Sequence, residues 1–271
     1  MHDLLDDHPV QPSKEMTLST ITVAVHGGVA RVTLDRPDDA NSLTTELLEE
    51  LSAELHALQG REDVFALVLG GEGRGFCAGM DRALAERLLP DGRLGAPQEL
   101  ARFLDLGGRV FEQIRTFRGI TIARVNGFAI GGGMLLMTAC DVRVVVGGAR
   151  LSVPEASFGL PLSWGAVGRL IDLVGEGRAL DWIATGRRLG FDEAVGSGFV
   201  TRAVDPEQLD AVVDEYVEAV RANPALFIGI TKPQIRSYAR PATTVPTLET
   251  LGSIGLLAVR DAQLGAAGSA K

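Results

Sequence analysis

The chain has 271 residues, 46% of them hydrophobic, and a formal net charge of −9. This length and hydrophobic content are sufficient for a large core, in one domain or in a domain with a helical appendage. The excess of acidic residues argues against a nucleic-acid-binding surface. No hydrophobic run approaches the length of a membrane-spanning helix, and residues 1–19 are too acidic and interrupted for a signal peptide. We therefore expect a protein that contacts neither nucleic acid nor membrane, with residues 1–19 as a flexible tail.

The two cysteines, Cys77 and Cys140, stand in apolar surroundings, outside any CxxC motif and without a histidine partner in a motif. Such residues are more often packed thiols than metal ligands or nucleophiles. We predict two buried thiols in a reducing, cytoplasmic environment, and no metal site.

The predicted elements begin with two strands of alternating polarity, residues 21–25 and 29–34. Two glycines, Gly27 and Gly28, lie between them and are a strong hairpin signal. A helix follows, because leucines recur at helical spacing up to Gly60, after possible N-terminal caps at Ser42 and Thr44. The leucine stripe predicts the side of this helix that faces the core.

Strands and helices alternate through the middle of the chain. This order indicates an α/β core, to which we assign residues 20–204. Between the two glycine-rich turns described below, residues 81–119 contain a broken, charged stretch and then an amphipathic helix. The expected elements are strands at 64–69 and 142–146, and helices at 100–114 and 164–174.

From Pro206 onward the pattern is helical only. One amphipathic stripe covers residues 209–220, a second helix follows Pro224 and should be kinked by Pro233, and a third covers residues 248–257. We assign residues 205–271 to a C-terminal helical region.

The most informative segment is residues 125–135, where an apolar strand leads into Gly131, Gly132 and Gly133, which open a short apolar helix. Glycines at such a turn permit positive φ, and a helix N-terminus presents unpaired N–H groups to a ligand. The segment lacks the lysine and hydroxyl of a mononucleotide P-loop and the glycine spacing of a dinucleotide fingerprint. It could hold negative charge, or the glycines could simply allow close helix packing.

A second glycine-rich turn lies upstream and favours the functional interpretation. The strand at 64–69 leads into residues 70–81, which contain five glycines before a helix start. Two such turns can each present one backbone N–H to a single oxygen, which is the geometry of an oxyanion hole.

These residues resemble the crotonase superfamily, also called the enoyl-CoA hydratase/isomerase family. The likeness is carried by residues 76–81 (Phe-Cys-Ala-Gly-Met-Asp), residues 125–133 (Val-Asn-Gly-Phe-Ala-Ile-Gly-Gly-Gly), residues 139–141 and the pair Pro154-Glu155. It extends from residues 31–37, which are similar to the family's first strand and its Arg-Pro turn, to Lys232 in the C-terminal helices. The resemblance implies a ββα spiral core, a C-terminal helical segment that packs between subunits, and a homotrimer or a dimer of trimers.

The resemblance also implies an acyl-CoA thioester as substrate, with no cofactor beyond the coenzyme A that the substrate carries. Its carbonyl oxygen would accept hydrogen bonds from the N–H groups of Met80 and Gly132. Such donors stabilise the charge that forms on the oxygen when a proton beside a thioester is removed. Residues near this hole are expected to contact the substrate, namely Arg36, Ala78, Gly79, Asp81, Gly131, Leu135, Ser163, Trp164 and Lys232.

The number of carboxylates at two positions of the site distinguishes hydration from isomerisation in this family. Hydratases of this family use two glutamates, one two residues after the glycine triplet and one after a downstream proline. This chain has Leu135 at the first position and Glu155 at the second. Hydration needs one group to activate water and another to deliver a proton, whereas one base can move a proton from one carbon to another. We therefore predict an enoyl-CoA isomerase with Glu155 as its base, whose pKa an apolar wall should raise.

Other acids and cations near the motifs have simpler roles. Related dienoyl-CoA isomerases have an aspartate where this chain has Ser163, and a serine cannot act as that acid. Asp81 is expected to cap the helix that it opens, and Glu86 to face solvent. The large Trp164 suggests a pocket shaped for a short, branched or ring-bearing acyl group. Cations that could offset the negative charge of coenzyme A are Arg36, Arg74, Arg82 and Lys232.

Several alternatives stay open. A group elsewhere in the chain could replace the glutamate missing at Leu135 and allow hydration. Decarboxylation, thioester hydrolysis and retro-aldol cleavage use the same enolate. The missing acid also permits a subunit that binds acyl-CoA without turnover.

Overall fold

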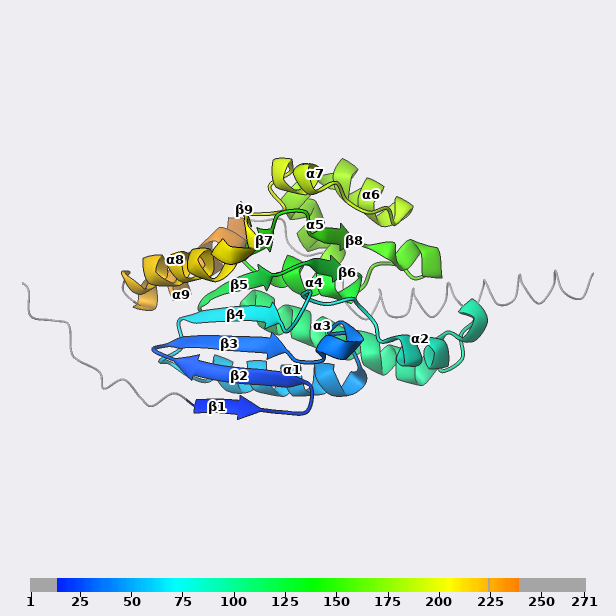
Figure 1. Ribbon diagram of the computed structural model, residues 1–271, viewed down its shortest axis with the longest axis horizontal. Coiled ribbons are helices and arrows are strands. Elements are labelled where there is room, and N and C mark those ends of the chain that lie inside the picture. The colour runs from blue at the N-terminus through cyan, green and yellow to red at the C-terminus, as the bar shows by residue number, and fades with distance from the viewer. Residues whose placement is uncertain (1–13, 224, 239–271) are drawn as a thin grey trace, which may run out of the picture.

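The computed structural model describes residues 14–223 and 225–238. Its main sheet has seven strands, in which the first three are antiparallel and each later one is parallel to its neighbour (Figure 1). In spatial order they are β1 (Lys14–Thr17), β2 (Ile21–His26), β3 (Val29–Leu34), β4 (Ala66–Gly71), β5 (Ile120–Val125), β7 (Val142–Val146) and β9 (Arg202–Val204).

A repeated ββα turn builds the core, as the resemblance implied. After β5 and after β7 the chain forms a short second strand and then a helix, and the short strands β6 (Phe128–Ile130) and β8 (Arg150–Ser152) pair in parallel as a small second sheet. The segment after β4 joins this sheet through a bridge between Cys77 and Ala129. The helices that close the three turns are α2 (Arg82–Leu88), α4 (Gly132–Ala139) and α5 (Ala166–Val174).

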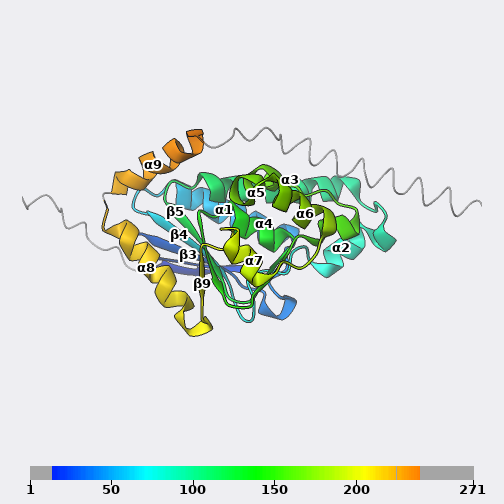
Figure 2. The same cartoon turned by 90° about the horizontal axis from the view of Figure 1, so that it is seen from above.

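Helices cover both faces of the main sheet. Figure 2 shows α1 and α3 on one face and α8 on the other. The remaining helices are α1 (Thr45–Gln59), α3 (Pro97–Thr116), α6 (Glu176–Thr185), α7 (Phe191–Gly196), α8 (Leu209–Arg221) and α9 (Ala225–Tyr238). Short 3₁₀ turns lie at η1 (Pro37–Asp39), η2 (Pro90–Gly92), η3 (Pro154–Phe158) and η4 (Pro206–Gln208).

Local signals place the first hairpin and α1 where the sequence predicts them. Gly27 and Gly28 both have positive φ in the turn between β2 and β3. The Thr44 side chain accepts a hydrogen bond from the Leu47 N–H, and α1 ends at Gly60. Its leucine stripe is buried against the core.

The prediction of a flexible tail over residues 1–19 is wrong for residues 14–17. These residues form β1, which pairs antiparallel with β2 along its whole length. The pairing is between separate segments, so the composition of the N-terminal segment gave no sign of it.

In the C-terminal region, α8 packs against the main sheet. Arg124 on β5 and Arg31 on β3 form ion pairs with Asp210 and Asp214 on α8, which attach this helix to the sheet. Helix α9 continues through Pro233. The third helix expected at 248–257 lies outside the described residues, and the assembly of three copies stays a prediction.

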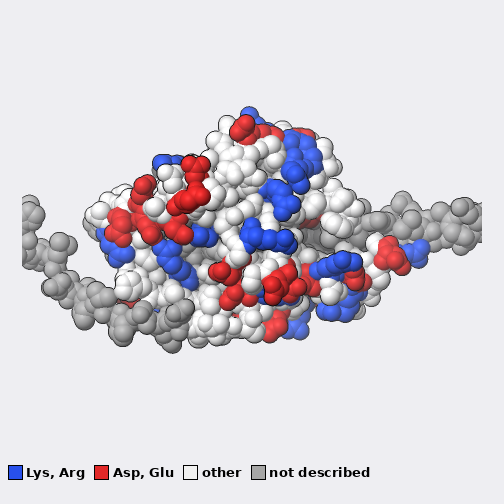
Figure 3. All heavy atoms as spheres, viewed as in Figure 1, with Lys and Arg blue, Asp and Glu red and all other residues white. Residues whose placement is uncertain are grey.

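Acidic side chains gather over α8 on the face shown in Figure 3, whereas acidic and basic side chains are interspersed elsewhere on it. No helix in the described part of the chain is both long and apolar enough to cross a membrane. Both cysteines are buried free thiols, and burial raises the pKa of each to about 12. The described residues contain no cluster of side chains that could hold a metal ion.

Candidate active site

The two glycine-rich turns meet at the edge of the small sheet. The Ile130 N–H donates to the Cys77 oxygen at 3.0 Å, and the Gly131 N–H donates to the Ser152 oxygen at 3.0 Å. A Cβ atom on Gly79 would lie 2.8 Å from the Ile130 oxygen and 3.4 Å from the Gly132 nitrogen. Only glycine therefore permits this close approach, and Gly79 also has a φ of +88°.

Met80 presents its N–H on the side away from Leu43. The Leu43 N–H donates to the Gly79 oxygen at 2.7 Å, and the Leu43 oxygen accepts from the Asp81 N–H at 2.9 Å. In an extended segment the peptide groups of successive residues face opposite sides. The flanking groups are used by Leu43, so the N–H of Met80 faces the opposite side, and Met80 itself lines a cavity.

Gly132 supplies the second N–H because it is the first residue of α4. The first N–H groups of a helix have no acceptor one turn earlier in the same helix. Among the described residues, no protein acceptor bonds to the N–H of Met80 or of Gly132. Both residues line the same cavity, and their joint role as an oxyanion hole stays a prediction.

Glu155 lies beside this hole. It belongs to the 3₁₀ turn η3, whose path is held by a hydrogen bond from the Leu160 N–H to the Glu155 backbone oxygen at 3.1 Å. Its Oε1 lies 3.1 Å from where a Cβ atom of Gly131 would stand, so glycine at 131 leaves room for the carboxyl group. Its Oε2 is buried and has no partner among the described residues, and burial raises the pKa of Glu155 to about 7.

The cavity between these groups is predominantly apolar and has a volume of about 210 Å³. Within the described part of the chain, Glu155 is the one titratable side chain that lines it. The predicted residues that line it are Ala78, Gly79, Met80, Gly131, Gly132, Leu135, Glu155, Ser163 and Trp164. Leu135, at the position where the resemblance implies a glutamate in hydratases, is buried.

Arg36 and Asp81 are close together but do not line the cavity. The Asp81 carboxylate caps α2 by accepting from the N–H groups of Ala83 and Leu84, as predicted. Arg36 donates to Asp81 at 3.2 Å and to the Ser42 oxygen at 2.6 Å. Arg36 therefore ties the Leu43 segment to the segment that carries Met80, and its guanidinium is occupied by protein groups.

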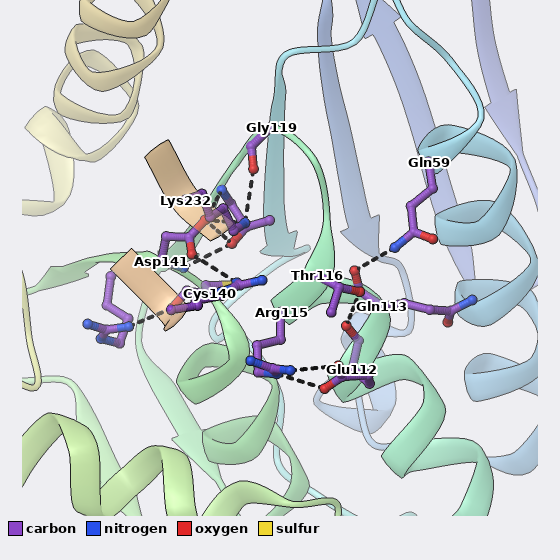
Figure 4. A network of polar contacts seen from close by, with 12 residues as sticks. Gln59, Glu112, Gln113, Arg115, Thr116, Gly119, Cys140, Asp141 and Lys232 are labelled. Carbon is purple, nitrogen blue, oxygen red and sulfur yellow. Dashed lines mark hydrogen bonds and ion pairs between the residues drawn. The ribbon is translucent and has the colours of Figure 1, made fainter. Parts of the chain in front are cut away.

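Lys232 lies away from the cavity and is not a solvated surface residue. Its side chain is buried, pairs with Asp141 at 2.5 Å and donates to the Gly119 oxygen at 3.0 Å (Figure 4). In this chain the predicted substrate contact is thus a structural contact between α9 and the sheet. Two other candidate cations, Arg74 and Arg82, are exposed, and Arg82 forms an ion pair with Glu86, which faces solvent as predicted.

The structure adds residues that the sequence motifs did not single out. Leu43 aligns Met80, and Phe103 and Leu104 of α3 form part of the cavity wall. Gly107 packs directly against the indole of Trp164, and a Cβ atom there would lie 1.9 Å from the ring. The adjacent glycines at 107 and 108 inside a helical pattern were the signal for this close contact.

Met80 and Gly132, whose N–H groups have no acceptor among the described residues, and the desolvated carboxyl of Glu155 thus line one cavity of a ββα spiral. The sequence profile of the enoyl-CoA hydratase/isomerase family matches residues 24–244. The chain belongs to this family, whose members act on acyl-CoA thioesters.

Individual relatives agree with this assignment. The chain is 32% identical over 222 residues to the short-chain-enoyl-CoA hydratase of Clostridium acetobutylicum, covering 81% of this chain and 82% of the relative. It is 30% identical over 218 residues to the crotonyl-CoA hydratase of Syntrophomonas wolfei, covering 80% and 81%. The crystal structure of an enoyl-CoA hydratase from Bacillus halodurans has the same fold, with a TM-score of 0.81 at 24% identity, covering 88% of this chain and 95% of that one.

Proposed function

We propose that the protein is an enoyl-CoA isomerase in which Glu155 moves a proton between two carbons of a β,γ-enoyl-CoA. The observation that carries this proposal is the cavity lining, in which Glu155 is the one titratable side chain among the described residues. Leu135, in the place of a second acid, can neither accept nor deliver a proton.

The thioester carbonyl oxygen would accept hydrogen bonds from the N–H groups of Met80 and Gly132. Glu155 would remove a proton from the α-carbon, and the electron pair of that C–H bond would move into the dienolate. The same proton would then return at the γ-carbon, which leaves the double bond in the α,β position. Atoms and charge balance without a cofactor, a metal ion or water.

The raised pKa of Glu155 suits both halves of this transfer. A base whose pKa is about 7 is substantially deprotonated near neutral pH, yet it holds a proton well enough to return it. A solvated glutamate would be a weaker base. Burial in an apolar cavity therefore supplies the required property without a second charged residue.

A second candidate is an enoyl-CoA hydratase, because the relatives from Clostridium acetobutylicum and Syntrophomonas wolfei are named hydratases. In this chain hydration would have to proceed with one acid. The same enolate would also serve decarboxylation, thioester hydrolysis or retro-aldol cleavage. We further propose that three copies assemble through the C-terminal helices, which sedimentation analysis of the full chain would test.

The decisive experiment supplies the purified protein with β,γ-hexenoyl-CoA and separately with crotonyl-CoA, separates the isomeric products by liquid chromatography against standards, and identifies added water by mass spectrometry. An isomer of unchanged mass formed from the first substrate, abolished by Glu155→Gln, supports the isomerase. Dominant addition of water to crotonyl-CoA supports the hydratase instead. Binding without turnover in a wider acyl-CoA screen would indicate a catalytically inactive subunit.

Leu135→Glu provides a matched gain-of-function variant. If the absent acid determines the reaction, this variant should increase hydration of crotonyl-CoA relative to double-bond movement. Leu135→Gln has a similar size without a carboxylate and is the control. Equal product ratios in the two variants would show that position 135 does not select the reaction.

A further inference from the structure

Trp164 has an unusual conformation for a bulky core residue. Its φ is +66°, in the left-handed region that side chains with a Cβ rarely adopt, and the residue is 4% exposed. Its indole Nε1 is buried and has no hydrogen-bond acceptor in the described part of the chain. Both features raise the free energy of the folded state, and residues kept in such conformations cluster at functional sites.

The indole extends from α3 to the start of α4. A Cβ atom on Gly107 of α3 would lie 1.9 Å from the ring Cε2 and 2.2 Å from Nε1. On the opposite side, a Cβ atom on Gly132 would lie 3.0 Å from the ring Cη2. The Phe103 ring packs against the indole with 6.2 Å between ring centroids. Glycine at 107 therefore gives the ring the space that it occupies.

This position makes the indole an end wall of the cavity. Phe103 and Leu104 line the cavity, but Gly107, one helical turn further along α3, does not. The indole lies in contact with Gly107 and also lines the cavity, so it separates this part of α3 from the cavity. The other edge of the indole lies beside Gly132, so this wall begins next to the expected position of the thioester carbonyl oxygen.

We propose that Trp164 closes the acyl end of the cavity and restricts the protein to acyl-CoA thioesters with short acyl chains. This inference rests on the proposed function, in which the acyl group lies beside Gly132. Replacement of the indole by a small side chain extends the cavity toward Gly107 and admits longer chains.

The test measures binding of saturated butanoyl-, hexanoyl-, octanoyl- and decanoyl-CoA to the full chain by titration calorimetry. A pocket that accepts a methylene group gains about fourfold in affinity from it. For the wild-type protein, affinity should stop rising after the shortest chains and then fall. For Trp164→Ala, affinity should keep rising, with octanoyl-CoA bound at least about tenfold more tightly than butanoyl-CoA.

Two outcomes of these titrations overturn the proposal. One is wild-type binding of decanoyl-CoA that is as tight as binding of butanoyl-CoA, and the other is an unchanged chain-length profile in Trp164→Ala. These ligands have no double bond, so their binding does not depend on proton transfer by Glu155. If binding follows the expected chain-length profile but the product assay shows no double-bond movement, the isomerase proposal is refuted and the proposal for Trp164 stands.

Trp182→Phe is the matched control, because Trp182 is the other of the two tryptophans and its Nε1 donates to Glu193 at 2.9 Å on a different part of the fold. This variant should keep the wild-type profile. Its remaining tryptophan is Trp164, so butanoyl-CoA should change its fluorescence emission, and unchanged emission at saturation would overturn the proposal. If Trp164→Ala does not fold, Trp164→Phe should shift the profile in the same direction by a smaller amount.

Discussion

Replacement of Glu155 by glutamine should stabilise the protein at pH 8 and abolish its activity. Burial raises the pKa of Glu155 from 4.5 to about 7. A carboxyl whose pKa is higher in the folded state favours folding below the pKa of the unfolded chain, and this contribution is lost as pH rises through about 7. The difference of about 2.5 pH units corresponds to at most about 3 kcal/mol of unfolding free energy, at 1.36 kcal/mol per unit.

The assay is urea unfolding of wild type and Glu155→Gln at pH 4.5 and pH 8. The variant should be more stable than wild type at pH 8, and most of the difference should disappear at pH 4.5. Glu86→Gln, at an exposed position, controls for the loss of any acid. In parallel, kcat/KM of the wild type should rise with pH through an apparent pKa near 7, because the base acts when deprotonated. Equal stability of wild type and Glu155→Gln at pH 8 would refute the reasoning that Glu155 is held desolvated.

Three further predictions follow from the site and its supports. Gly132→Ala should lower kcat by about a hundredfold or more, because a Cβ atom would lie 2.6 Å from Leu43 Cδ1 and displace the N–H donor. Met80→Leu should retain most activity in the same kinetic assay. Lys232→Met should lower the unfolding free energy by about 3 kcal/mol, measured by urea unfolding, because it breaks a buried ion pair with Asp141. Arg82→Met is the exposed control, and equal stability of the two variants would contradict a stabilising role of Lys232. Cys77 should resist iodoacetamide in the native protein at pH 8 and react after unfolding, because the pKa of its buried thiol is about 12. Rapid labelling of Cys77 in the native protein, detected by mass spectrometry, would contradict this expectation.

Features encoded by neighbouring residues could be predicted from the sequence. Helix α1 begins after Thr44, one of the two predicted caps, and ends just before Gly60, as expected. The glycine-rich turns that line the cavity were predicted from their own residues, because glycines permit the backbone geometry that these turns need. Each of these signals lies within a few residues of the structure that it specifies.

Features that depend on distant partners could not be predicted in this way. Lys232 looked like a free surface cation because its partner Asp141 belongs to a different part of the chain. Arg36 looked available for a ligand, but it is held by Asp81, which lies forty-five residues away. The adjacent glycines 107 and 108 indicated a close contact on α3, but the left-handed backbone at Trp164, and the fact that its indole fills this space, become visible only when the loop before α5 packs against α3.

The side chain at position 135 affects both the number of acids in the cavity and the polarity of its wall. Leu135 is one of the apolar residues that line the cavity, and burial in that cavity raises the pKa of the Glu155 carboxyl. A glutamate at 135 would bring a second charge into the same small cavity, and two nearby carboxyls cannot both ionise freely. With leucine at 135, Glu155 is the one titratable side chain that lines the cavity among the described residues, and the isomerisation that we propose needs no second one.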